Sequence, residues 1–141
     1  MQSNKTLMAA LAGGLAFFLM GWLCYGQLMA GFLADNAGSA TGVNKEPPEI
    51  WALALGDLGL GFFFTIAFQK MTPIPATIMD GMKSGAMMGL LLGASMDMMM
   101  YGMTNIMTLK GAVGDMITFT VVVAVGCGVI AWVLGRGHKA A

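Results

Sequence analysis

Two aspartates, Asp57 and Asp97, lie inside long apolar stretches and are the residues whose chemistry most needs an explanation. An ionisable side chain within a membrane costs several kcal/mol unless it is paired, hydrated or protonated. Each aspartate lies about 10 Å from the outer end of its stretch, and no Lys, Arg or His occupies that depth. We therefore expect the two carboxyl groups to share a proton, to bind a cation or to accept hydrogen bonds.

Hydroxyl and amide side chains at similar depth are candidate hydrogen-bond donors to this pair. If the aspartates meet, they should titrate as one unit, as in a proton relay or a cation site. A hydrogen-bonded cluster that only fixes how the helices pack is the alternative. The predicted intramembrane site comprises Asp57, Asp97, Tyr101, Asn105, Tyr25 and Thr118, with Thr120 as a further donor.

Methionine is unusually frequent, at 16 of 141 residues, and it crowds around Asp97. Thioethers suit Cu(I), so a methionine-lined metal path is one interpretation, with Met96, Met100 and Met103 as the candidate ligands. The competing interpretation is that flexible methionine fills irregular apolar gaps. Because consecutive methionines point around most of a helix and no Cys or His joins them, we expect packing, and no cofactor.

Glycine recurs every fourth residue in the stretch that contains Asp97. Four residues turn a helix by about 400°, so these glycines form one slowly winding stripe that lets another helix approach closely. The stripe is either a groove for a helix of the same chain or a homo-oligomer interface. Its members are Gly81, Gly85, Gly89 and Gly93, continued at the same spacing by Asp97, Tyr101 and Asn105.

Composition dictates the elements that must position these residues. The chain is 57% hydrophobic and only 10% charged, which excludes an ordinary soluble domain. A membrane-spanning helix needs about 20 apolar residues, and four such stretches occur. The prediction is an all-α integral membrane four-helix bundle in a single domain, 1–141, with an outer loop at 34–49 and helices at about 7–33, 50–68, 82–103 and 117–134.

Charges set the expected orientation. Five Lys or Arg residues lie on the side of both termini and two on the other, so the positive-inside rule predicts an N-in/C-in topology. Asp80 and Asp115 fall at the starts of the third and fourth stretches, where an acid favours the helix dipole. Cys24 and Cys127 are predicted at different depths, which argues against a disulfide. With no net charge, we expect no nucleic-acid partner.

One stretch carries a resemblance to known sequences. The segment Tyr101-Gly-Met-Thr-Asn105-Ile-Met-Thr-Leu-Lys110, with the preceding Gly93-Ala-Ser-Met-Asp97, resembles the signature of small bacterial membrane proteins classed as a domain of unknown function. Gly21-Trp-Leu-Cys-Tyr25-Gly is similar to an element near the end of helix one in another such family. The resemblance implies a four-helix, multi-pass protein of the bacterial inner (cytoplasmic) membrane, and it implies no activity.

Two function classes follow. The first is a proton- or cation-linked transporter or channel component that uses the carboxylate pair. The second is a non-catalytic accessory subunit that assembles through the glycine stripe into a homo-oligomer or larger membrane assembly. We expect no enzyme, because the single histidine, His138, lies in the tail and the chain contains no phosphate loop, zinc-protease or nucleophile-elbow motif.

Overall fold

The computed structural model describes residues 2–136 and is helical throughout, with no strand among those residues. His138, and Lys139, which is one of the five cations counted above, lie outside the described residues. The all-α prediction is confirmed. The elements are α1 (Gln2–Leu23), a π-helical segment η1 (Cys24–Leu28), α2 (Ala30–Asp35), α3 (Ile50–Lys70), α4 (Ile78–Met103) and α5 (Leu109–Gly135).

Three helical segments are long and apolar enough to cross a membrane within the described part of the chain: Ser3–Leu28, Ile50–Lys70 and Leu109–Gly135. The prediction of a membrane protein is thereby supported. α4 has the necessary length, at 26 residues, but its glycines and its three charged residues make it less apolar than the others. Its status as a fourth span stays a prediction.

The first predicted stretch, 7–33, is divided into three parts. The helix widens to the π form at Cys24–Leu28, where the Met29 amide donates to the Cys24 carbonyl at 2.7 Å. The chain then restarts as α2, which ends at Asp35 with Asn36 as its C-cap. A π turn adds one residue to a helical loop and turns the following side chains toward new neighbours. Tyr25 lies within this turn.

The last helix begins eight residues earlier than the predicted 117. The Thr108 hydroxyl caps α5 by accepting a hydrogen bond from the Gly111 amide at 3.1 Å. Lys110 and the glycines that follow lower the hydropathy of this segment without breaking the helix. The apolar stretch therefore begins later than the helix does, and the predicted start was too late. The helix-start role expected for Asp115 is therefore wrong, because Asp115 lies well inside α5.

The predicted helix-start position of Asp80 is confirmed. Asp80 lies in the first turn of α4, where its amide donates to the Thr77 hydroxyl at 3.1 Å and its carboxylate accepts from that hydroxyl at 2.6 Å. The two groups satisfy each other as in a capping box. The second and third predicted helices, 50–68 and 82–103, match α3 and α4 to within four residues at each end.

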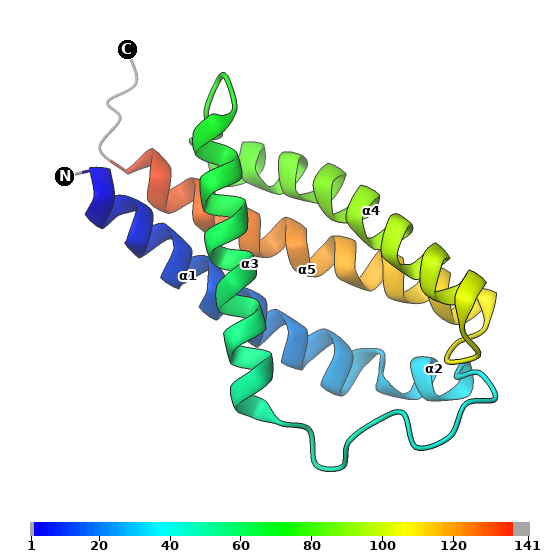
Figure 1. Ribbon diagram of the computed structural model, residues 1–141. Coiled ribbons are helices and arrows are strands. Elements are labelled where there is room, and N and C mark those ends of the chain that lie inside the picture. Colours follow the sequence, from blue (N-terminus) through cyan, green and yellow to red (C-terminus); the bar gives the residue numbers. More distant parts are fainter. Residues whose placement is uncertain (1, 137–141) are drawn as a thin grey trace.

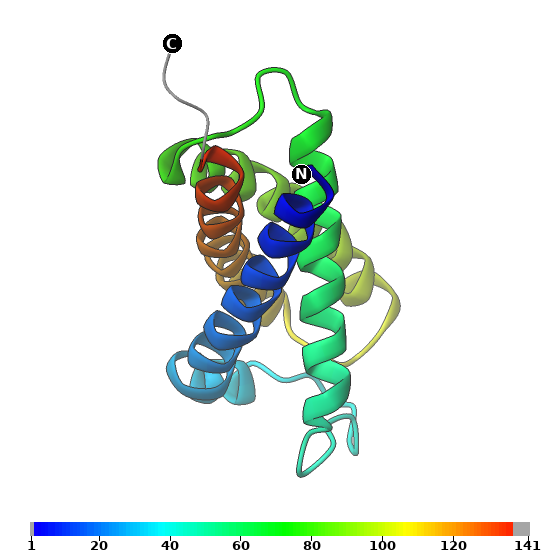
Figure 2. The same ribbon diagram turned by 90° about the vertical axis from the view of Figure 1, so that its left-hand side faces the viewer.

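The helices form two packed pairs, α4 with α5 and α1 with α3, and the two pairs meet where α1 packs against α5. α4 runs along α5, while α1 crosses α3 and also packs against α5 (Figures 1 and 2). The Gln69 side chain donates to the Thr6 hydroxyl at 2.7 Å, which ties the end of α3 to the start of α1. The beginnings of α1 and α4 and the ends of α3 and α5 therefore lie at one end of the molecule (Figure 1).

The glycine stripe of α4 lies against α5. All four glycines are buried, and a β-carbon added to Gly81 would overlap Ala131, while one added to Gly85 would overlap Cys127. A β-carbon added to Gly89 would lie 2.8 Å from the Val123 Cβ, and one added to Gly93 would lie 3.2 Å from the Phe119 Cδ1. The stripe is thus occupied by a helix of the same chain.

A second close approach joins α1 to α3 and was not predicted. A β-carbon added to Gly61 would meet the backbone of Ala10 and Gly14, and one added to Gly14 would lie 2.9 Å from the Leu58 Cα. Phe17 of α1 fills the notch left by Gly126 of α5. Glycine therefore permits both of the tight helix pairs in the fold.

Candidate functional site

Two aspartates do meet, but they are Asp97 and Asp115. Each lies six residues from the helix end that borders the 104–108 turn, or about 9 Å along its axis. Because α4 and α5 are antiparallel neighbours, equal distances from the turn bring these two positions to the same level. The Asp115 carboxyl is close enough to the Asp97 carboxyl for the two charges to act on each other.

Asp97 is the most deeply buried charged residue of the described chain. Its side chain is 8% exposed, and its Oδ2 atom is fully buried with no hydrogen-bond partner. A buried oxygen that accepts nothing is expensive, because its lost hydration is not replaced. Protonation would lower this cost, because a neutral carboxyl group loses less hydration on burial than a carboxylate does.

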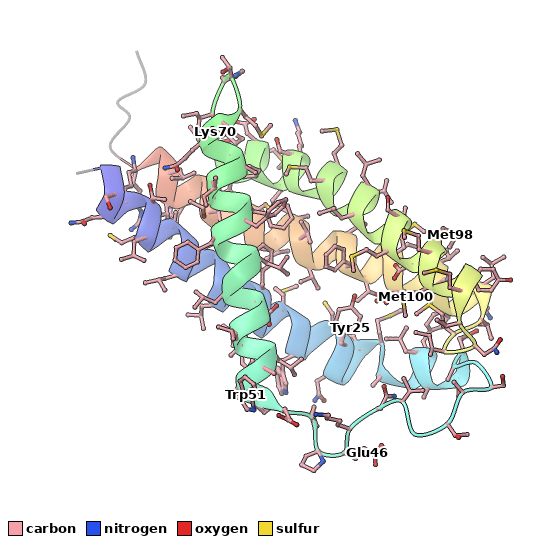
Figure 3. All side chains as sticks on the ribbon, in the orientation of Figure 1. Tyr25, Glu46, Trp51, Lys70, Met98 and Met100 are labelled. Atoms are coloured by element: carbon pink, nitrogen blue, oxygen red, sulfur yellow. The ribbon has the colours of Figure 1, made fainter. Side chains whose placement is uncertain are left out.

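Tyr25 completes the cluster from η1. Its hydroxyl is close enough to Asp115 and Asp97 for the charges of both carboxyls to act on it. The half-buried ring extends from η1 toward α5 (Figure 3). Because π turns occur frequently at functional sites, its position in the only π segment among residues 2–136 fits a site of function.

No basic side chain neutralises this acidic pair. Within the described residues the one ion pair joins Lys45 to Glu49 in the outer loop, and Lys110 lies over the Phe32 ring, 6.0 Å from its centroid. Two facing ionised carboxylates would repel each other strongly in a low dielectric. A single proton held between Asp97 and Asp115 removes both the repulsion and the orphaned oxygen.

The cluster is reached from a cavity of about 430 Å³ beneath the loops that join the helices. Asp115 and Tyr25 line it, together with Asn36, Asn44 and Met107. A water-filled cavity of this kind would connect Asp115 with the end of the molecule that carries the 36–49 loop. Asp97 lies behind Asp115, on the far helix.

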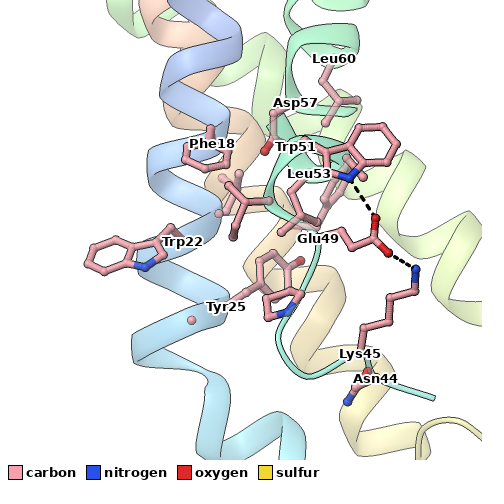
Figure 4. Close-up of a pocket in the computed structure, with 17 residues that line it drawn as sticks. Phe18, Trp22, Tyr25, Asn44, Lys45, Glu49, Trp51, Leu53, Asp57 and Leu60 are labelled. Atoms are coloured by element: carbon pink, nitrogen blue, oxygen red, sulfur yellow. Dashed lines mark hydrogen bonds and ion pairs between the residues drawn. The ribbon is translucent and has the colours of Figure 1, made fainter. Parts of the chain in front are cut away.

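The expected meeting of Asp57 with Asp97 does not occur. α3 packs on α1 and α5, whereas α4 packs on the other side of α5. Asp57 instead lines a separate cavity of about 950 Å³ between α1 and α3 (Figure 4). The predicted depth of each aspartate did not determine which helices are neighbours.

The Asp57 cavity has aromatic walls and a loop at its mouth. Phe18 and Trp22 of α1 and Trp51 and Leu53 of α3 border it, and the Trp22 ring extends away from α3 (Figure 4). At the mouth, Glu49 accepts hydrogen bonds from the Lys45 Nζ and, at 2.9 Å, from the Trp51 Nε1. Tyr25 lines both this cavity and the smaller one.

Three of the predicted hydrogen-bond donors have other roles. The Thr118 hydroxyl donates to the Gly114 carbonyl within α5 at 2.7 Å. Tyr101 is 42% exposed. Asn105 is exposed, and its backbone carbonyl accepts from the Ala40 amide at 3.0 Å, which fastens the 104–108 turn to the long loop.

The methionines do not converge. Met96 and Met103 are 63% and 70% exposed, and Met98 and Met100 extend from opposite sides of α4 (Figure 3). Within residues 2–136 no group of three His, Cys, Asp or Glu side chains is arranged to hold a metal ion. Cys24 and Cys127 are both free and buried.

Asp115 is the site residue that the sequence reasoning missed. The signal was Thr108, a good N-cap residue, because a helix that starts there sets Asp115 and Asp97 symmetrically about the turn. Tyr25 and Asp97 were predicted as members of the site. Searches among family models, curated proteins and solved structures find no match to this chain.

Proposed function

We propose that this chain is a small multi-pass membrane protein that conducts or exchanges protons through the Asp97–Asp115 pair and Tyr25. The observation that carries the proposal is the buried, unpartnered Oδ2 of Asp97 beside a second carboxyl group. Intramembrane acids that face a bundle interior commonly mark ion or proton pathways. The protein is then a proton-linked transporter or a channel component of the bacterial inner membrane.

The site suits a proton better than a dehydrated metal cation. Hard cations such as Ca²⁺ take six or more oxygen ligands, whereas this cluster supplies two carboxyl groups and one phenol. No third acid joins them among the described residues. A proton needs only one donor and one acceptor, and a carboxyl pair provides both when it carries one proton.

The expected path starts in the smaller cavity. A proton arrives at Asp115, which lines the cavity, and passes to Asp97, which does not. When the proton is on Asp97, Asp115 is ionised. The Tyr25 hydroxyl would then donate to the Asp115 carboxylate and stabilise its charge.

The proposed topology has four crossings. Three segments are apolar enough to span, and α4 would be the fourth, shielded along its glycine face by α5. Four crossings return both termini to one side, and the lysine and arginine count favours the cytoplasm for that side. The 36–49 loop and the smaller cavity would then face outward.

Proton flux in liposomes tests the proposal. Purified protein is reconstituted with a trapped pH-sensitive dye, and a potassium gradient with valinomycin supplies the driving potential. We expect flux in the wild type and its loss, by about tenfold or more, in Asp97→Asn and Asp115→Asn, because each amide removes an exchangeable carboxyl proton.

Asp80→Asn is the matched control, since Asp80 is an exposed acid at the start of the same helix. It should keep wild-type flux. Absence of flux in the wild type, or equal flux in the wild type and in both site variants, would overturn the proposal.

The alternative of an accessory subunit that assembles through the glycine stripe is less well supported. α5 covers all four glycines, so that surface is not open to a second chain. Any homo-oligomer would have to use another face of the helices.

A further inference from the structure

The larger cavity combines an acid with aromatic walls and has no assigned role. Its volume of about 950 Å³ lies at the upper end of the range for pockets that hold small organic molecules. Asp57 is half-buried in it, about two helical turns from the start of α3 (Figure 4). The carboxyl forms no ion pair or hydrogen bond with another described residue of the protein.

The charge of this cavity is unbalanced. Lys45 is the only basic residue in its lining, and its Nζ is already paired with Glu49 at the mouth. Asp57 therefore contributes one uncompensated acidic group to an otherwise mainly apolar surface. Charge complementarity calls for a ligand with one positive charge.

The walls favour a particular kind of cation. Phe18 and Tyr25 border the cavity together with the largely exposed Trp22 and Trp51. Aromatic faces attract cations, especially poorly hydrated ones such as quaternary ammonium groups. A strongly hydrated inorganic ion would lose its water here without gaining enough oxygen ligands. An organic cation loses little hydration and buries apolar area at the same time.

We propose that the α1–α3 cavity binds a lipophilic organic monocation, such as a quaternary ammonium or protonated aromatic amine, with Asp57 as its counterion. The juxtaposition of Asp57 with the aromatic walls carries this inference, and it stands apart from the proton site at Asp97 and Asp115. The shared wall residue, Tyr25, places the two sites next to each other.

Tryptophan fluorescence provides the binding assay, because two of the three tryptophans, Trp22 and Trp51, line the cavity. Tetraphenylphosphonium is titrated into the detergent-solubilised full-length protein. We expect saturable quenching, with an affinity at least about tenfold weaker in Asp57→Asn, because the amide keeps the shape but removes the charge. A variant that keeps Trp22 and Trp51 but carries Trp132→Phe should give the same titration as the wild type.

Two controls separate specific binding from partition into the micelle. Tetraphenylborate has the same shape and the opposite charge, so it should quench without a difference between wild type and Asp57→Asn. Asp80→Asn should bind tetraphenylphosphonium as tightly as the wild type does. Non-saturable quenching, or equal affinity of the wild type and Asp57→Asn for the cation, would overturn the inference.

The two proposals fail independently. Binding is measured without a proton gradient, and proton flux is measured without an organic cation. Loss of cation binding in Asp57→Asn alongside normal proton flux supports the separate site described here. Cation binding that is abolished by Asp97→Asn but not by Asp57→Asn contradicts it.

Discussion

At the scale of single residues, the account depends on one carboxyl oxygen. Asp97 Oδ2 and the Thr65 hydroxyl are the two buried side-chain oxygens of the described residues without a partner, whereas Thr118 and Thr120 donate to carbonyls of their own helix. A group that only stabilises packing would be expected to have such a bond. Retaining an unsatisfied acid costs stability, and proteins tolerate that cost chiefly at functional sites.

The first prediction concerns the stability of Asp97→Asn. The amide preserves the shape of the side chain and removes the need to bury a charge or bind a proton. We therefore expect the thermal unfolding midpoint in detergent to stay level or rise, while proton flux is lost. A fall of several degrees would show that the Asp97 carboxyl holds the fold together, and it would favour the purely structural interpretation.

The second prediction concerns the Tyr25 hydroxyl. Tyr25→Phe keeps the ring between the two cavities and removes only the group that faces Asp115. Proton flux should fall by about tenfold, because an ionised Asp115 loses its hydrogen-bond donor.

Tyr101→Phe is the matched control for that experiment, because Tyr101 is the other tyrosine of the chain and is 42% exposed. It should conduct like the wild type. If Tyr101→Phe lowers flux as much as Tyr25→Phe, then the hydroxyl group at the pair has no special role.

At the scale of helices, glycine decides which elements touch. The stripe on α4 was visible in the sequence, but the sequence does not say which helix fills it. The partners on α5 are small or branched side chains, Val123, Cys127 and Ala131, which continue at the same four-residue spacing. The crossing of α1 and α3 uses isolated glycines, Gly14 and Gly61, whose spacing carries no comparable signal.

The third prediction compares two glycines of α4. A β-carbon at Gly85 would overlap the Cys127 side chain, whereas one at Gly102 would meet nothing within 4 Å. Gly85→Ala should destabilise the protein by about 1–3 kcal/mol through overpacking. Gly102→Ala should be neutral or slightly stabilising, because alanine favours the helix. Equal midpoints of thermal unfolding for the two variants would contradict the α4–α5 contact.

The fourth prediction compares two glycines of α3. Gly61 lies against the backbone of α1, while nothing lies within 4 Å of a β-carbon at Gly59. Backbone cannot move aside as a flexible side chain can, so Gly61→Ala should cost at least as much as Gly85→Ala. Gly59→Ala should leave the unfolding midpoint close to that of the wild type, and a large loss there would mean that α3 is rotated from the position described.

At the scale of the whole molecule, composition predicted an all-helical protein with segments apolar enough to cross a membrane. It could not predict the pairing of acids, because that depends on the order in which helices pack rather than on depth. Asp57 and Asp97 were matched by depth, yet α1 and α5 keep their helices apart. The true pair was obscured by a helix start placed at 117, where hydropathy rises, instead of at Thr108, where the cap lies.

The fifth prediction concerns topology. The 36–49 loop and the 71–77 loop lie at opposite ends of the molecule (Figure 1). Single cysteines introduced as Thr41→Cys and Thr72→Cys should therefore label oppositely in intact cells, with Thr41→Cys alone reacting with a membrane-impermeant maleimide. The native cysteines are buried, which keeps the background low. Labelling of both variants, or of Thr72→Cys alone, would contradict the proposed orientation.

The shared proton is tested most directly by infrared spectroscopy of the protein in lipid at neutral pH, since a protonated carboxyl has a C=O stretching band well separated from that of a carboxylate. We predict such a band in the wild type, its loss in Asp97→Asn and a change in its frequency in Asp115→Asn, with no change in Asp80→Asn. No protonated carboxyl band in the wild type, or a band that is identical in Asp97→Asn and Asp115→Asn, would contradict the account.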